Sequence, residues 1–370
     1  MGKKYGIVTT CHAINYGAVL QAYALKECVK EITNGDVYII NYPGNLQIMG
    51  REMYRPLCGI KSIIYNLKVF FDIKYKAERK NLIYKFDVFK KNCLEIDSEL
   101  LKTQKELNER VDCDVLISGS DQIWNLNLMN DKVFFLDFQT SMSSVKRYSY
   151  AASIAEKMNN EQKKLIKKRV QNFNGISVRE KKTSKELEKY LGQKVFNHID
   201  PVFLRTEREW RHFSNCKNVA KERYILVFMI GRYKSDQYIV DAVKKHYGLP
   251  TKQIKMHPVS WIKTDSAFEI LAPEEFVKAI FEADIIVTDS FHAVSFSIIA
   301  QKNFYTIKRS TRNSRIENLF NILAISNRYL DINHLDKMNN MEQINYDMVK
   351  KNIRKEQMKS YDYIRSMTEG

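Results

Sequence analysis

YGIVTTCHAINYGAVLQAYALKECVKEITNGDVYIIN, residues 5–41, is the stretch that decides the fold. Its residues 5–10 form a mostly apolar run of the kind that makes a buried strand, whereas Leu20 and Ala24 recur at helical spacing. Residues 36–41 supply a second strand candidate. A strand, a helix and a strand in this order predict a βαβ unit, and a parallel sheet follows from it.

The same alternation continues along the chain of 370 residues. This length exceeds what one hydrophobic core usually serves, so we expect two α/β domains. The further strand candidates are residues 115–117, 147–151, 175–178, 195–199, 224–230, 285–287 and 304–307, and the further helix candidates are residues 160–172, 293–300, 341–367 and a segment that begins near Thr183.

The boundary between the two domains is predicted at Asp200-Pro201, because proline disfavours helix in the residue before it. The predicted domains are residues 1–200 and 201–335. Residues 336–370 form a charged helical segment that we expect to pack across both domains.

Residues 51–92 interrupt the first domain with a basic, aromatic and helix-compatible stretch. One interpretation is a helical hairpin packed on that domain, with a solvated basic face. The other is an amphipathic surface that rests on an anionic membrane, at which lipid-linked sugars are found. The sequence leaves both open.

Composition narrows the class of protein. The formal net charge of +17 attracts phosphates, anionic lipid headgroups or nucleic acid. No recognition helix, aromatic RNA-binding strand or zinc finger is present, so we do not expect nucleic acid as a partner. The apolar runs are too short for a membrane span or a signal peptide, and the six cysteines form no C-x-x-C pair. These features predict a cytoplasmic protein with reduced thiols.

Polar clusters follow three of the predicted strands. They are the loop 11–17, the loop 118–124 and the turn 290–292. Ligands of open parallel sheets bind beyond the carboxyl ends of the strands, so three such clusters facing one cleft would form a site. The first loop lacks G-x-G-x-x-G, which disfavours a tightly bound dinucleotide.

Two residues in these clusters are candidates for proton transfer. His292 lies at a strand-to-helix junction, where free N–H groups favour an anion and an imidazole adds a titratable proton; its structural alternative is a helix-start histidine bonded to a neighbouring backbone group. Asp121 is suited to serve as a general base or to cap a short helix. Trp124 is suited to stack on a sugar or to fill the core.

Arginines provide candidate anion sites. Arg179 ends a strand beside Glu180, where its guanidinium suits a carboxylate or phosphate, or forms a simple surface pair. Arg309, Arg312 and Arg315 form a second basic group. Asp112 and Asp114 match the D-x-D metal motif, but they precede the strand 115–117, so we expect them to mark the entry to that strand and predict no metal site.

Several segments together resemble the polysaccharide pyruvyl transferase family, and the resemblance runs from about Gly6 to about Leu319. They are Gly6 to Thr10, Asn15 to Leu25, Gly119 to Trp124, Ser177 to Glu180, Asp200 to Val202 and Thr288 to Ala293. The resemblance implies two Rossmann-like domains facing a cleft, as in the GT-B fold. It also implies transfer of pyruvyl from phosphoenolpyruvate, as donor substrate without a further cofactor, onto a sugar of a cell-surface or exopolysaccharide, forming a ketal.

The family's carboxyl-domain motif has a histidine at the position of His292 and, in many members, an arginine where this chain has Ser290. Arg179 would then carry more of the anion binding. We predict that His292, Asp121 and Arg179 are catalytic. The predicted substrate-binding residues are Asn15, Gly17, Ser120, Trp124, Ser290, Phe291, Arg309 and Arg315.

Two other functions remain open at the level of sequence. One is a GT-B glycosyltransferase that uses a nucleotide sugar. The other is a non-catalytic glycan-binding or scaffold protein of the same fold, for which Ser290 is the supporting feature. The expected partners are phosphoenolpyruvate, a sugar or lipid-linked oligosaccharide and an anionic membrane surface.

Overall fold

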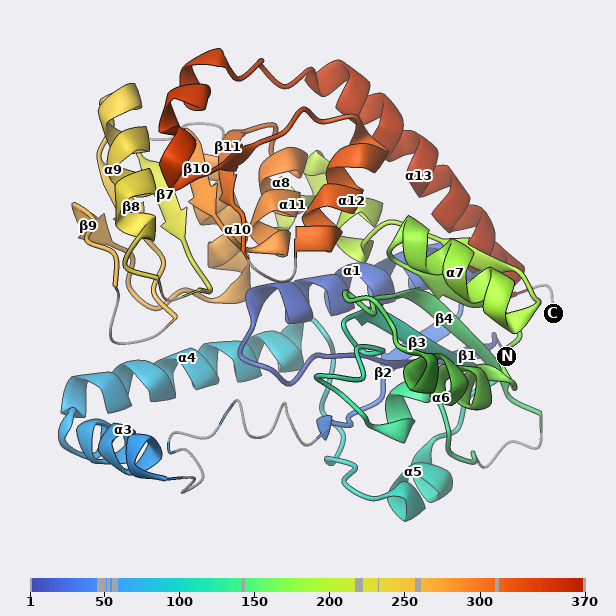
Figure 1. The fold of residues 1–370 in the computed structure, drawn as a ribbon. Coiled ribbons are helices and arrows are strands. Elements are labelled where there is room, and N and C mark those ends of the chain that lie inside the picture. Colours follow the sequence, from blue (N-terminus) through green and yellow to red (C-terminus); the bar gives the residue numbers. More distant parts are fainter. Residues whose placement is uncertain are drawn as a thin grey trace. The chain divides into compact units, whose positions relative to one another are not determined.

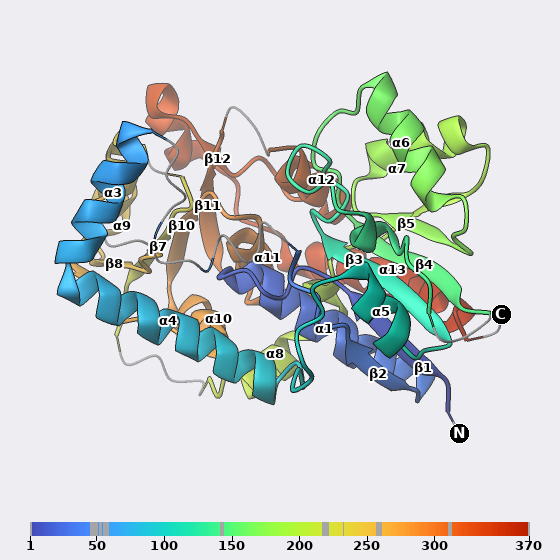
Figure 2. The ribbon, with the colours of Figure 1, turned by 90° about the horizontal axis from the view of Figure 1, so that it is seen from below.

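The computed structural model describes residues 2–44, 51, 54, 59–140, 144–216, 222–231, 233–256, 261–309 and 313–368. The chain forms two compact units. The first unit contains residues 1–52, 87–205 and 353–370, and the second contains residues 53–86 and 206–352. Each unit is built around its own six-stranded sheet (Figures 1 and 2).

The first unit has the strand order β2-β1-β3-β4-β5-β6, and its described pairings are parallel. Its elements are β1 (Lys4–Val8), α1 (Tyr16–Thr33), β2 (Asp36–Ile39), α5 (Gln104–Arg110), β3 (Val115–Asp121), η1 (Lys132–Phe135), β4 (Lys146–Ala152), α6 (Asn160–Val170), β5 (Ile176–Val178), α7 (Lys181–Leu191), β6 (Val195–Asn197) and η2 (Pro201–Leu204).

The second unit has the order β12-β11-β10-β7-β8-β9, again with parallel pairings. Its elements are α3 (Ile60–Phe71), α8 (Glu207–Phe213), β7 (Ile225–Phe228), α9 (Asp236–Tyr247), β8 (Thr251–Gln253), β9 (Ser266–Ala267), α10 (Pro273–Glu282), β10 (Ile285–Thr288), α11 (Phe291–Ile299), β11 (Asn303–Ile307), α12 (Asn313–Leu323), β12 (Tyr329–Leu330) and η3 (Ile332–Asn340).

Two long helices contain residues of both units, namely α4 (Ile73–Asn92) and α13 (Tyr346–Ser366). The predicted α/β class with parallel sheets is confirmed. The predicted helical character of residues 51–92 is found in α3 and α4, and residues 53–86 group with the second unit.

Local chemistry sets where the helices begin. The side chain of Asn15 accepts hydrogen bonds from the N–H groups of Gly17 and Ala18, so α1 begins at Tyr16. Ser290 caps α11 in the same way by accepting from the N–H of Ala293. Asn15 lies in the connection that follows β1, and Ser290 lies in the connection that follows β10, so each helix begins on the carboxyl side of its strand.

The predicted linker Asp200-Pro201 is part of the first unit. Asp200 is buried and caps η2, and the four residues of η2 are buried as well. The helix η2 packs against α1, and the division between the units falls after Arg205. A proline therefore ends the extended segment here without separating the domains, because the segment beyond it is still packed in the core.

Candidate functional site

The strand order locates the candidate site of the first unit. The chain runs from β1 outward to β2 and then returns to β3 on the other side of β1. The carboxyl ends of β1 and β3 therefore flank a topological switch point, at which parallel sheets bind ligands. The predicted loop 11–17 follows β1, whereas residues 118–121 of the predicted loop 118–124 form the last part of β3 and only residues 122–124 follow that strand.

A hydrogen-bond network joins the end of β3 to α1 and to the residues that follow β1. Gln21 Nε2 donates to Thr9 Oγ1 over 2.8 Å, and its Oε1 accepts from Ser120 N over 3.1 Å. Thr10 Oγ1 donates to Asp121 Oδ2 over 3.2 Å. Thr10 and Gln21 were not among the residues predicted for the site, although both lie within segments that carry the family resemblance.

Asp121 ends β3 with a backbone conformation that most residues avoid. Its φ is 70°, in the left-handed region, and the residue is 8% exposed. Among non-glycine residues aspartate adopts this region comparatively readily, and residues held there cluster at functional sites. The hydrogen bond from Thr10 holds the Asp121 carboxylate at the switch point.

Arg179, at the end of β5, is brought to the same cluster. Its Nη2 lies 2.8 Å from Ser120 Oγ and 2.7 Å from Asp200 Oδ2, and its Nη1 lies 3.8 Å from Asp121 Oδ1. The guanidinium is almost fully buried. The predicted catalytic residues Asp121 and Arg179 therefore lie together, with Asp200 as a charge partner that the sequence analysis missed.

Glu180 does not provide the surface pair considered as the alternative for Arg179. Its carboxylate is buried and accepts hydrogen bonds from Ser153 Oγ and from the N–H of Ile154. Arg179 is likewise buried, so the two neighbours point into different hydrogen-bond networks.

The predicted residues Asn15 and Gly17 have different environments. Asn15 is exposed, and its side chain caps α1, whereas Gly17 is buried and donates its N–H to that cap. The first N–H groups of α1 are thus bonded to Asn15 within the chain.

Trp124 belongs to the core of the first unit, which corrects its prediction as a sugar platform. Its side chain has no exposed surface, and its Nε1 donates to Phe134 O over 3.0 Å. The ring stacks on Phe135 with the centroids 5.2 Å apart and meets Phe173 edge-on. An indole with both faces covered has no surface on which a sugar can stack.

The second unit has an equivalent switch point. The chain passes from β7 through β8 and β9 and returns to β10 on the other side of β7. After β10 and Asp289, Ser290 caps α11, and Phe291 and His292 are its first two residues. All three are buried, and His292 is 6% exposed. The structure therefore places His292 in the first turn of a buried helix, at the edge of the sheet where ligands bind.

Arg309 lies beside this turn and is held by two carboxylates. Its Nη1 and Nη2 contact both oxygens of Asp236 at 2.8 and 2.7 Å, and its Nε and Nη2 contact Asp289 Oδ2 at 2.9 and 2.7 Å. Burial alone would lower the pKa of Arg309, but its hydrogen bonds to Asp236 and the negative charges of both aspartates outweigh burial and raise it. Its charge is thus balanced inside the unit, which does not favour the predicted role in substrate binding.

Asp289 also fixes the loop that follows β7. It accepts hydrogen bonds from the N–H of Ile230 over 2.7 Å and of Gly231 over 2.8 Å. Asp289 lies within the segment Thr288 to Ala293 that carries the family resemblance, but the sequence predicted no role for it. Asp289 follows β10, and its carboxylate accepts hydrogen bonds from the loop after β7. It therefore links the two strands that flank the switch point.

Arg315 is the remaining predicted substrate-binding residue. It is 9% exposed, and its guanidinium lies 5.3 Å from the centre of the Phe291 ring. Arg315 therefore lies beside the turn that contains Phe291 and His292. Ser120, Asp121 and Arg179 form one group in the first unit. Phe291, His292 and Arg315 form another in the second unit, and a cleft shared by the two groups stays a prediction.

The predicted strand entry of Asp112 and Asp114 is confirmed. Asp114 Oδ2 accepts from Lys4 N over 2.7 Å, and Asp112 Oδ2 pairs with Lys4 Nζ over 2.7 Å. Both aspartates precede β3 and join it to β1. Among the described residues, no group of three or more His, Cys, Asp or Glu side chains is arranged to hold a metal ion.

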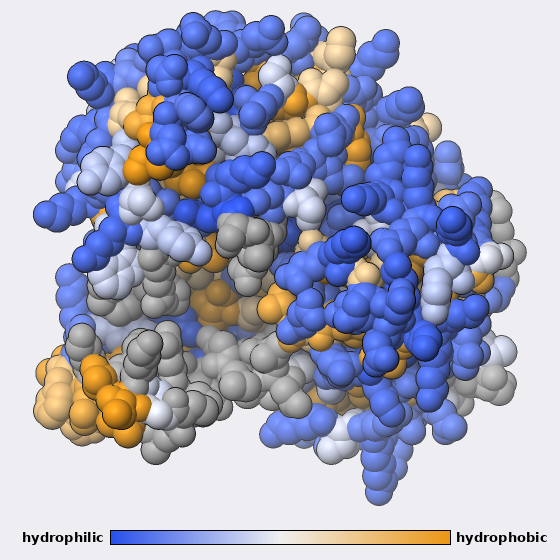
Figure 3. Space-filling model, viewed as in Figure 1, coloured by the Kyte–Doolittle hydropathy of each residue, from blue (hydrophilic) through white to orange (hydrophobic). Residues whose placement is uncertain are grey.

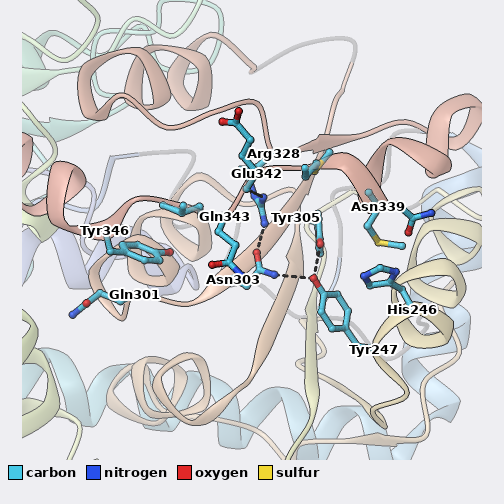
Figure 4. A pocket seen from close by; sticks show the side chains of 13 residues that line it. His246, Tyr247, Gln301, Asn303, Tyr305, Arg328, Asn339, Glu342, Gln343 and Tyr346 are labelled. Carbon is cyan, nitrogen blue, oxygen red and sulfur yellow. Dashed lines mark hydrogen bonds between the residues drawn. The ribbon is translucent and has the colours of Figure 1, made fainter.

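A pocket of about 430 Å³ lies in the second unit, at the edge of the sheet where the strands begin (Figure 4). This edge is opposite the one that carries the His292 turn. Asn303 bridges Tyr247 and Arg328 there, with its Nδ2 2.8 Å from the Tyr247 hydroxyl, which in turn lies 2.6 Å from the Tyr305 hydroxyl. Arg328 also donates to Phe304 O and Glu342 O. These groups bond to one another, and the pocket lies away from the switch point.

A family model described as polysaccharide pyruvyl transferase matches residues 15–311 of the chain. No curated protein matches it in sequence. Similar solved structures include the heptosyltransferase WaaC of E. coli with ADP, at 13% identity and TM-score 0.38, covering 95% of this chain and 99% of that one. Another is UDP-GlcNAc 2-epimerase of Methanocaldococcus jannaschii with UDP-GlcNAc and UDP, at 13% identity and TM-score 0.47, covering 99% and 100%. Sequence identities and TM-scores this low do not indicate a function for this chain.

Proposed function

Because the chain belongs to the polysaccharide pyruvyl transferase family, we propose that it moves the pyruvyl group of phosphoenolpyruvate onto two hydroxyls of a sugar in a cell-surface or exopolysaccharide. The observation that carries this proposal is the family match, which covers Asp121, Arg179 and His292. Fold alone would not select a reaction, since the same architecture serves many chemistries.

The reaction has a defined atom balance. An acid protonates the methylene carbon of phosphoenolpyruvate, and a sugar hydroxyl adds to the adjacent carbon while a base takes the hydroxyl proton. The bond between that carbon and the phosphate oxygen then breaks, and inorganic phosphate leaves. A second hydroxyl of the same sugar adds and loses its proton, which closes the ketal. The reaction therefore needs an acid, a base and positive charge for the phosphate.

In this scheme His292 supplies the acid or the phosphate contact, and Asp121 supplies the base. The clustering of Asp121 with Ser120 and Thr10 at the first switch point supports that assignment, because it holds the carboxylate in one place. Arg179 is assigned to the anion, and Asp200 already balances part of its charge. Its main contribution in this geometry is to hold Ser120 and the Asp121 carboxylate in position.

The polar residues at the His292 turn support donor binding in the second unit. The N-terminus of α11 provides a favourable environment for negative charge, and Arg315 adds a cation next to Phe291. Ser290, where many family members have arginine, caps the helix. This difference predicts weaker donor binding than an arginine would give, without loss of the reaction.

The test is release of phosphate from phosphoenolpyruvate in the presence of a panel of sugar acceptors, with detection of the ketal by mass spectrometry. We expect acceptor-dependent release that falls at least ~100-fold in His292→Ala. His246→Ala is the matched control, because His246 is an exposed histidine of the same unit. A melting temperature equal to that of the unaltered protein shows that the variant is folded.

Two outcomes would contradict the proposal. Transfer of a sugar from a nucleotide sugar, with no turnover of phosphoenolpyruvate, would identify a glycosyltransferase. Binding of glycans without turnover of either donor would identify a non-catalytic glycan-binding protein.

We also propose that the protein meets its acceptor at an anionic membrane surface. The net charge of +17 favours such a surface.

A further inference from the structure

The helix α3 carries an apolar face that is exposed to solvent. Six of its side chains and the residue that begins α4 are between 46% and 78% exposed. They are Ile60, Ile63, Ile64, Leu67, Phe70, Phe71 and Ile73. Figure 3 shows apolar side chains gathered at this hairpin. Single exposed apolar residues are ordinary, but a contiguous group of this kind marks a binding surface.

The exposed residues lie on one side of the helix. Their positions follow the spacing i, i+3, i+4, i+7, i+10 and i+11, which places them within one stripe of an α-helix. The buried residues Ser62 and Val69 lie on the other side. An amphipathic helix of a globular protein normally turns its apolar stripe to the core. This helix turns it outward, so the stripe is left for something outside the described chain.

Positive charge borders this face. Between residues 60 and 80 the chain has six basic and two acidic residues. Lys76 Nζ donates to Phe70 O over 2.8 Å and lies 5.3 Å from the centre of the Phe70 ring, at the edge of the apolar stripe. Lys74 is 87% exposed, and Lys80 is exposed as well. An apolar stripe with a cationic border matches the surface of an anionic bilayer.

We propose that the apolar face of α3 inserts into the interfacial region of an anionic lipid bilayer and anchors the protein there. Among the described residues, no helix is both long and apolar enough to cross a bilayer. The contact we propose lies in the plane of the membrane, with Phe70, Phe71 and Ile64 among the acyl chains and the lysines at the phosphates.

A second copy of the chain is the main competing occupant of this face. A symmetric contact through α3 would place the same basic border on both sides of the interface, because an isologous interface pairs each patch with itself. Like charges across such an interface repel, whereas anionic headgroups neutralise them. The charge around α3 therefore favours lipid over self-association.

The test is co-sedimentation of the whole protein with vesicles of phosphatidylcholine alone or with phosphatidylglycerol added. We expect binding to the anionic vesicles, and at least ~10-fold weaker binding for Ile64→Ser/Leu67→Ser/Phe71→Ser, since each substitution removes apolar area from the inserted face. The matched control is Tyr238→Ser/Ile332→Ser/Met348→Ser, which alters three exposed apolar residues elsewhere in the second unit. We expect the control to bind as the unaltered protein does.

The electrostatic part is tested by Lys74→Gln/Lys80→Gln. We expect several-fold weaker binding to anionic vesicles and a smaller loss of binding on adding salt. Equal binding by the unaltered protein and the α3 triple variant would overturn the proposal. So would a dimer, measured by light scattering, that the triple variant loses.

This inference does not rest on pyruvyl transfer, because vesicle binding is measured without substrate. On a short water-soluble acceptor, the α3 triple variant is expected to keep the phosphate release of the unaltered protein. Failure of vesicle binding with intact turnover would remove the anchor alone, and absent turnover with intact vesicle binding would remove the proposed reaction alone.

Discussion

Arg179 and Asp200 form an ion pair inside the first unit, with Nη2 of the arginine 2.7 Å from Oδ2 of the aspartate and side chains that are 3% and 0% exposed. Removing one member of such a pair leaves an uncompensated buried charge. We expect Arg179→Met to lower the free energy of unfolding by ~3–5 kcal/mol, measured by urea unfolding followed by circular dichroism.

The exposed pair of Lys105 and Glu109, with nitrogen and oxygen 3.8 Å apart, provides the control for this comparison. Lys105→Met is expected to change the free energy by less than ~0.5 kcal/mol, because solvent screens exposed pairs. If Arg179→Met were equally mild and only its activity fell, the arginine would be a substrate ligand and not a structural partner of Asp200.

Gly119 is required by the close approach of β3 and β4. A Cβ at this position would lie 2.1 Å from the carbonyl oxygen of Tyr150, which is backbone and cannot move aside without separating the strands. We expect Gly119→Ala to destabilise the first unit by ~3 kcal/mol or more, the magnitude of a severe core clash, as measured by its melting temperature.

Gly192 is the left-handed C-cap of α7 and provides a control for Gly119. An alanine there tests the cost of the backbone conformation without a steric clash. The φ of Gly192 is 72°, and a Cβ there meets no atom within 4 Å. Gly192→Ala is therefore expected to cost only ~1–2 kcal/mol, from conformation alone. Equal losses for the two alanine variants would show that the contact with Tyr150 is not what requires glycine at position 119.

Arg309 is expected to stabilise the second unit and not to bind substrate. Arg309→Met would leave Asp236 and Asp289, whose side chains are 3% and 4% exposed, without their cation. We expect a loss of ~3–5 kcal/mol in the free energy of unfolding. Arg223→Met is the control, since Arg223 is 73% exposed in its pair with Asp284 and should contribute less than ~1 kcal/mol. Normal stability with a raised KM for phosphoenolpyruvate would restore the substrate-binding role.

The sequence predicts the sheets better than the site, and the reason is physical. Apolar runs such as residues 285–287 are local signals, and β10 forms there because a strand covered on both faces needs such a run. The partnership of Arg179 with Asp200 depends on β5 lying between β4 and β6, which no local pattern encodes. Asp200 therefore looked like a linker residue.

The spacing of apolar residues in a helix also does not show whether its apolar face is buried or exposed to solvent. The pattern in residues 60–71 indicates an amphipathic helix, but the same spacing fits a stripe that is covered and one that is exposed. Only the structure shows Ser62 and Val69 buried and Leu67 exposed. Trp124 is a similar case, because a polar turn surrounds it in the sequence while Phe134, Phe135 and Phe173 surround it in space.

The protein is expected to lose unfolding free energy in mild acid, because two histidines of the first unit are buried. Burial lowers the pKa of both His12 and His198 to about 3, with smaller contributions from Lys90 and Arg51 at His12 and from Lys359 at His198. The unfolded chain binds these protons near pH 6.5, whereas the folded chain binds them only near pH 3. Their contribution to stability is thus complete above pH 6.5 and declines as the pH falls towards 3.

Each histidine is expected to remove about 1.4 kcal/mol of unfolding free energy per pH unit below its unfolded pKa. Measurements between about pH 6.5 and pH 5 avoid the ordinary range of carboxylate titration. His198→Gln removes a ring that stacks on Tyr150 and bonds to Ser177, so it lowers stability at neutral pH but should halve the acid slope. His246→Gln, at an exposed position of the second unit, should leave the slope unchanged. An acid slope that His198→Gln does not reduce would mean that His198 is already protonated in the folded protein, and that the loss of stability comes from other groups.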